Sequence, residues 1–133
     1  MRVVVDTNVL VSGIFWKGLP ALVLDQWHRR KFEWLISTDI LDEYYRVAEE
    51  LHTEYPAIEI QPILDLITQG AHLVAPRPGP VPACDDPDDR MFLAAAVSGK
   101  AQFIVSGDKA LLRVSTYPGG KVVTVKQFLA LTT

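Results

Sequence analysis

The chain has 133 residues, of which 49% are hydrophobic and 22% are charged, a composition typical of one folded domain spanning residues 1–133. Its net charge of −3 argues against strong general affinity for nucleic acid, because phosphate contacts need clustered lysine and arginine. No apolar run is long enough to span a bilayer. Cys84 is the only cysteine, which excludes an intrachain disulfide and favours a reducing compartment. We therefore expect a cytoplasmic protein.

Strand and helix signals alternate along the chain. Glycines and prolines separate them, and residues 76–87 hold five prolines, which predicts a loop. We expect Gly70 to end the third helix in the C′ position. In chain order, the pattern predicts a strand at 3–5, a helix at 20–30, a strand at 32–36, helices at 40–52 and 58–69, a strand at 72–75, a helix at 86–99, a strand at 102–105, a helix at 109–113, a strand at 121–125 and a helix at 126–131.

This alternation predicts an α/β fold, in which a parallel sheet is covered on both faces by right-handed crossovers. In such sheets, ligands and chemistry lie outside the carboxyl ends of the strands. A candidate site residue should therefore directly follow a strand or lie near the start of the next helix.

Asp6 meets this condition at the end of the first strand. Its carboxylate is expected at the carboxyl edge of the central strand, where Thr7 and Asn8 can orient its oxygens or hold a metal-bound water. An aspartate in this position is also a common turn former or helix cap. Asp108 follows the strand at 102–105 in the same way, and it is also suited to cap the next helix.

Glu43 lies in the second turn of the helix at 40–52. At about 100° per residue, this helix has one apolar face, on which Asp42 cannot lie. Glu43 falls on the shoulder of that face, where it can lean over the edge of the sheet, although a solvated surface role fits the same position. The apolar face is formed by Ile40, Leu41, Tyr44, Val47, Ala48 and Leu51.

Asp89 heads the buried stripe of the helix at 86–99, three and four residues before Phe92 and Leu93. A carboxylate in that position is costly unless it is paired, capped or bound to a cation. Asp88 points away from the stripe, and Asp86 is the expected N-cap. The alternative is that Asp89 completes a capping arrangement with Asp86.

These four acids are expected at one edge of the sheet, where their mutual repulsion calls for a divalent cation. The three histidines, His28, His52 and His72, lie elsewhere, so only oxygen ligands are available. Such a site favours Mg²⁺ or Mn²⁺ over Zn²⁺. A bound metal of this kind can activate water and stabilise an in-line phosphodiester displacement.

Four segments carry the candidate acids in order along the chain: VVVDTNVLVS (3–12), STDILDEYYR (37–46), DPDDRMFL (86–93) and IVSGD (104–108). They resemble the motifs of the PIN-domain family, and the likeness runs over almost the whole chain. The closest resemblance is to VapC-like toxins of bacterial and archaeal toxin–antitoxin pairs. Ser106 stands where threonine is more usual, and the third segment is crowded with acids, which leaves open whether Asp86, Asp88 or Asp89 contacts the metal.

The resemblance implies a three-layer α/β/α fold with a central parallel sheet of about five strands. It also implies Mg²⁺- or Mn²⁺-dependent endoribonuclease activity on an RNA substrate, an antitoxin partner and a homodimer, for which apolar residues such as Met91 offer a face. By motif match, the catalytic and metal-binding acids are Asp6, Glu43, Asp89 and Asp108, with Asn8, Ser106 and Asp86 in supporting positions.

Three other interpretations of the function compete with this one. A phosphatase of the haloacid dehalogenase type also begins with a strand that ends in aspartate, but it needs a second aspartate where this chain has Asn8. No Walker loop or G-x-G-x-x-G turn is present, which argues against a nucleotide cofactor enzyme. The remaining alternative is a catalytically inactive PIN-like domain that binds RNA or a protein.

The basic residues at 29–31 form a cluster that fits the solvated C-terminal end of the helix at 20–30.

Overall fold

The computed structural model describes residues 1–133 and contains one sheet of six strands. The strand order is β3-β2-β1-β4-β6-β5; all neighbours are parallel except β5, which pairs with β6 in antiparallel fashion. Their bounds are β1 Arg2–Val5, β2 Glu33–Ile36, β3 His72–Leu73, β4 Phe103–Val105, β5 Thr116–Tyr117 and β6 Gly120–Val123.

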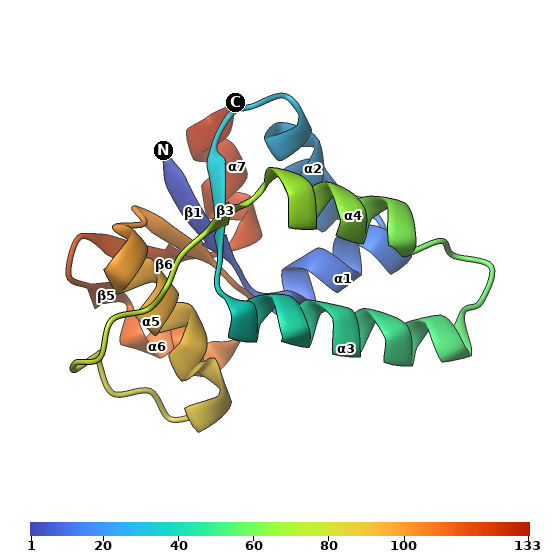
Figure 1. The fold of residues 1–133 in the computed structure, drawn as a ribbon. Coiled ribbons are helices and arrows are strands. Elements are labelled where there is room, and N and C mark those ends of the chain that lie inside the picture. Colours follow the sequence, from blue (N-terminus) through green and yellow to red (C-terminus); the bar gives the residue numbers. More distant parts are fainter.

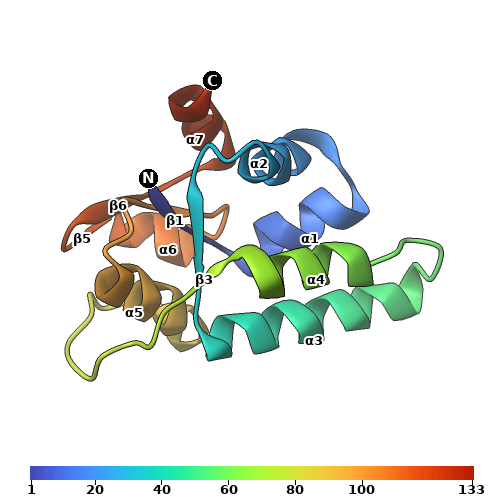
Figure 2. The ribbon, with the colours of Figure 1, turned by 45° about the horizontal axis from the view of Figure 1, so that its top comes forward.

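Helices cover both faces of the sheet, as the alternating pattern predicts. Figures 1 and 2 show α5 and α6 on one side and α1, α2, α3, α4 and α7 on the other. The structure therefore confirms the predicted three-layer α/β/α arrangement. The helices are α1 Thr7–Phe15, α2 Gly18–His28, α3 Thr38–Glu54, α4 Gln61–Gly70, α5 Arg90–Gly99, α6 Lys109–Val114 and α7 Val125–Thr132, with a short 3₁₀ helix, η1, at Pro87–Asp89.

No single helix is long and apolar enough to cross a membrane. Only α1 and α2 taken together reach the necessary length and composition, and the chain bends by 101° between them.

Helix α1 was not predicted, because Gly13 and Gly18 were interpreted as turn residues. Gly13 instead lies inside the helix, where a Cβ atom would come within 3.0 Å of Leu24 and 3.1 Å of the Pro20 carbonyl oxygen. The glycine is therefore needed for the close approach of α1 and the start of α2. The short strand β5 was also missed; it is the antiparallel partner that turns back onto β6.

The predicted role of Gly70 was wrong. Gly70 is the last residue of α4, and Ala71, in extended conformation, is its C-cap. A Cβ atom on Gly70 would lie 3.1 Å from the ring of Trp27. The absence of a side chain thus serves the packing of α4 against α2 rather than the end of the helix.

Strand β1 lies at the centre of the sheet and is the reference for the site. Val3, Val4 and Val5 are fully buried. The Tyr44 hydroxyl on α3 donates a hydrogen bond to the Val5 carbonyl and accepts one from Trp34 Nε1, which ties α3 to the carboxyl end of β1. From β1 the chain crosses to β2 on one side, while β4 lies on the other side. The carboxyl ends of β1 and β4 therefore form the switch point where α/β sheets place their ligands.

Candidate active site

Asp6 and Asp108 are joined at this switch point through Ser106. The Asp6 amide donates to the Val105 carbonyl oxygen over 2.9 Å, which sets the carboxyl ends of β1 and β4 level. Ser106 Oγ donates to Asp6 Oδ2 over 2.7 Å and accepts from the Asp108 amide over 2.9 Å. Asp6 and Ser106 are both buried, so this contact is shielded from water.

Glu43 approaches the same edge from α3. The helix begins at Ser37, whose hydroxyl accepts a hydrogen bond from the Ile40 amide and caps the first turn. Thr7 Oγ1 donates to Glu43 Oε2 over 2.5 Å, and the other carboxylate oxygen of Glu43 pairs with Arg46 over 3.4 Å. The helical periodicity had placed Glu43 on the shoulder of the apolar face, and its side chain is 21% exposed, as that position requires.

Asp89 is buried at the start of α5, as the apolar stripe predicted; only 6% of its surface is exposed. Its side chain makes no capping hydrogen bond, and its Oδ2 atom is buried without any hydrogen-bond partner. The local cap is Asp86, whose Oδ1 accepts from the Asp88 amide over 2.9 Å. The structure therefore shows no capping contact for the Asp89 side chain. Its buried Oδ2 atom has neither a hydrogen-bond donor nor a cation beside it.

Asp86, Asp89 and Asp108 come together as one carboxylate cluster. One oxygen from each lies within 4.8 Å of the others, which is compatible with a shared metal ion. Asp108 also caps α6, because its Oδ1 accepts from the Ala110 amide over 3.0 Å. The sequence had given Asp86 a supporting role, whereas the geometry places it beside the two predicted acids. Asp88 is exposed and outside the cluster.

The electrostatics of the site disfavour four ionised acids. Burial, followed by the neighbouring Asp108, Asp6 and Asp86, raises the pKa of Asp89 to about 8. Burial also raises the pKa of Asp6; the Ser106 hydrogen bond opposes this shift, while Asp108 and Glu43 add to it. A divalent cation would relieve both effects, because it favours the charged form of each carboxylate. The unpartnered Asp89 oxygen and the all-oxygen donor set fit Mg²⁺ or Mn²⁺.

Two supporting contacts could not be assigned from the sequence. Thr7 was expected to serve Asp6, but its hydroxyl binds Glu43 from across the α1–α3 contact. Arg46 was not singled out, although its position three residues after Glu43 and four before Glu50 is the usual spacing of helical ion pairs. The side chain of Asn8 makes no hydrogen bond within the chain; with Asp108, it lines a shallow cavity of about 310 Å³.

The gathering of the four predicted acids at one edge of the sheet agrees with the comparison with known families. The PIN domain family matches residues 2–110. The chain belongs to the PIN domain family. No curated protein and no solved structure matches it. PIN domains are usually metal-dependent nucleases that bind divalent metals, and the cluster of Asp86, Asp89 and Asp108 is compatible with that chemistry.

Proposed function

We propose that this PIN domain is an Mg²⁺- or Mn²⁺-dependent endoribonuclease and the VapC-like toxin of a type II toxin–antitoxin pair. The observation that supports the enzymatic part most directly is the buried Asp89 oxygen without a partner, next to Asp86 and Asp108. A domain that only bound RNA or protein would gain nothing from this arrangement, because burying an unpaired carboxylate opposes folding.

In this proposal, Asp6, Glu43, Asp89 and Asp108 hold the metal. An ion held there would activate water and stabilise charge in an in-line phosphodiester displacement. The chain supplies the positioning: Ser106 fixes one oxygen of Asp6, and the contacts of Thr7 and Arg46 fix Glu43. Asp86 and Asn8 border the same edge, where they can orient water and substrate.

Cleavage of single-stranded RNA tests the enzymatic part. We expect the purified protein to cut RNA internally with Mn²⁺ or Mg²⁺. EDTA should abolish the activity, because without the ion nothing lowers the pKa of the attacking water or stabilises the developing charge. The measurement is a time course on an end-labelled RNA resolved by gel electrophoresis. Full activity in EDTA would contradict the metal mechanism, and no cleavage with either metal would favour the inactive, RNA- or protein-binding PIN-like domain.

The toxin part predicts an inhibitory partner that places an arginine or lysine among the acids. A cation there replaces the charge of the metal, and Arg46 beside Glu43 illustrates the favourable pairing. The candidate is the protein encoded next to this chain, and the measurement is its inhibition of RNA cleavage. We expect neutralisation of its basic residues to remove most of the inhibition. Undiminished inhibition after neutralisation would contradict the proposed mode.

A homodimer remains part of the proposal, but Met91 does not support it. The sequence suggested that Met91 points away from the sheet, whereas it is half-buried and packs against the hydrophobic core. Light scattering tests the oligomeric state directly, and a strict monomer at high concentration excludes the dimer.

A further inference from the structure

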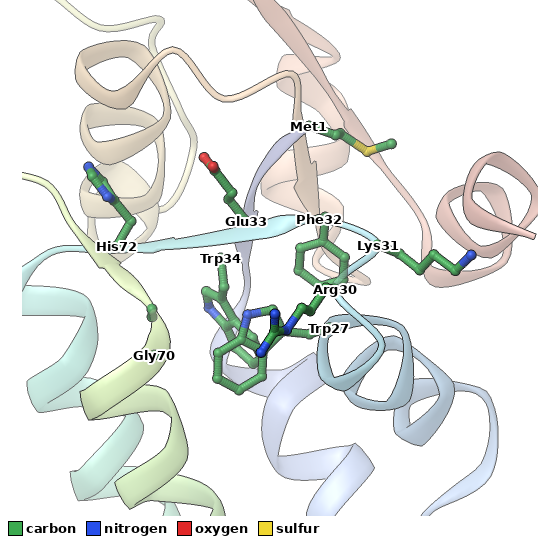
Figure 3. Close-up of a pocket in the computed structure, with 10 residues that line it drawn as sticks. Met1, Trp27, Arg30, Lys31, Phe32, Glu33, Trp34, Gly70 and His72 are labelled. Atoms are coloured by element: carbon green, nitrogen blue, oxygen red, sulfur yellow. The ribbon is translucent and has the colours of Figure 1, made fainter.

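A second feature lies at the opposite edge of the sheet from the acids. Met1 precedes β1 and Glu33 begins β2, and both line a cavity of about 590 Å³ at the amino ends of these strands. Figure 3 shows its centre, where Trp27, Arg30, Phe32 and Trp34 gather between β2 and the end of α4. The proposed nuclease site makes no use of this cavity.

The floor of the cavity is aromatic. Phe32 and Trp34 are buried, and the half-buried Trp27 ring packs against Trp34 edge-on, with the ring centroids 5.1 Å apart. Gly70 packs closely against one edge of the Trp27 ring, since a Cβ atom there would lie 3.1 Å from it. Trp27, Arg30 and Gly70 also line an adjoining cavity of about 380 Å³, so the hollow continues past the Trp27 ring. A planar ligand group can therefore reach an indole that the rest of the fold holds in place.

The rim of the cavity carries uncompensated positive charge. Glu33, which lines the cavity, is paired with Arg2 at 3.3 Å, and Asp25 on α2 is paired with Arg29 at 3.2 Å. Arg30 and Lys31 are exposed and have no carboxylate within 4.0 Å. On a chain with a net charge of −3, this rim is suited to an anionic ligand.

Arg30 also occupies a backbone position that favours glycine. Its φ angle is +62°, and it directly follows Arg29, the C-cap of α2. The Arg30 amide donates to the Trp27 carbonyl and the Lys31 amide to the Gln26 carbonyl, which closes the helix as a glycine at C′ usually does. A side chain in this conformation costs about 1 kcal/mol relative to glycine. Glycine can therefore replace Arg30 without backbone strain, so Arg30→Gly removes the side chain and its charge alone.

We propose that this cavity binds single-stranded RNA, with a base stacked on Trp27 and phosphates held by Arg30 and Lys31. A partly accessible aromatic ring beside cations is the combination that holds unpaired nucleotides, whereas the bases of a duplex are already stacked. The inference rests on the proposed ribonuclease function and adds a second RNA contact to it. The strand β1 separates the two edges by roughly 13 Å, so one RNA of several nucleotides can occupy both.

Fluorescence anisotropy of a labelled single-stranded oligoadenylate of about 12 nucleotides, measured in EDTA, tests this contact without cleavage. We expect Arg30→Gly to weaken binding about 10-fold and to reduce the salt dependence by about 0.7 in log–log slope, because one phosphate contact is lost. Its melting temperature should not fall, because glycine suits the backbone. Trp27→Leu should also weaken binding about 10-fold through loss of stacking.

Lys100→Gly is the matched control. Lys100 is an exposed cation at φ +56° after α5, and it does not line the cavity. We expect its affinity to stay within about two-fold of wild type, since only long-range charge changes. Equal weakening by Lys100→Gly and Arg30→Gly would overturn the proposal in favour of general charge attraction. Adenosine monophosphate binding as tightly as the oligonucleotide would overturn it in favour of a mononucleotide site.

The failure of this proposal and the failure of the proposed function are distinguishable. The binding assay contains no metal, so it reports on the cavity even if the protein cuts no RNA. Wild-type binding that depends on Arg30, without cleavage in Mn²⁺, contradicts the nuclease alone. Cleavage in Mn²⁺, with binding that is indifferent to Arg30, contradicts the cavity alone.

Discussion

Asp89→Asn should lower the rate of Mn²⁺-dependent RNA cleavage by on the order of 10²-fold or more, because it removes the charge of a metal ligand while keeping the size of the side chain. Asp6→Asn should have an effect of the same order. Asp6 loses the carboxylate oxygen that Ser106 holds next to Asp108. The measurement is the initial rate of RNA cleavage at saturating Mn²⁺.

Asp88→Asn is the matched control for this experiment. Asp88 is adjacent in sequence and carries the same charge, but it is exposed and outside the carboxylate cluster. Its rate should stay close to that of wild type. If Asp89→Asn leaves the cleavage rate unchanged, the third metal ligand is Asp86, the remaining acid in the cluster. Asp86→Asn would then show the large loss of rate.

The sequence was sufficient for those parts of the site that follow from periodicity. Asp6 and Asp108 lie at strand ends because the apolar runs end there, and the helical spacing separates Glu43 from Asp42 and Asp89 from Asp88. The burial of Asp89 follows from its place at the head of an apolar stripe, which local sequence reports directly. These features depend on one element at a time.

Other features depend on two elements that meet only in the folded chain. The Thr7 hydroxyl reaches Glu43 because α1 packs on α3, and α1 itself was missed since Gly13 is a packing residue rather than a turn residue. Asp86 joins Asp89 and Asp108 because η1 and the turn after β4 approach one another. Likewise, the sequence does not predict the left-handed backbone conformation of Arg30, because glycine rather than arginine favours it.

The acid cluster should also control stability. The folded protein holds a proton on Asp89 up to a pKa of about 8, whereas the ordinary value is 3.8. The folded pKa lies above the unfolded one, so the free energy of unfolding falls as the pH rises between these values, and the penalty is complete above the higher value. In EDTA at neutral pH, Asp89 therefore destabilises the fold, and its neutralisation should relieve part of the penalty.

We expect Asp89→Asn to raise the melting temperature in EDTA by a few degrees, equivalent to about 1 kcal/mol. The difference from wild type should widen as the pH rises towards 8 and should vanish below about pH 3, where Asp89 is protonated in both the folded and the unfolded state. Asp88→Asn should show no such pH-dependent gain, because its carboxylate is exposed. Thermal melts of the three proteins across this pH range provide the measurement.

Metal should reverse the order of the two proteins. In wild type, Mn²⁺ at about a hundred times its dissociation constant adds roughly 2.7 kcal/mol to the free energy of unfolding. Asp89→Asn should lose most of that gain, so it is the more stable protein in EDTA and the less stable one in Mn²⁺. A helix cap has the opposite signature, because its loss lowers stability with or without metal. If Asp89→Asn is less stable than wild type in EDTA and still responds fully to Mn²⁺, Asp89 is not a metal ligand.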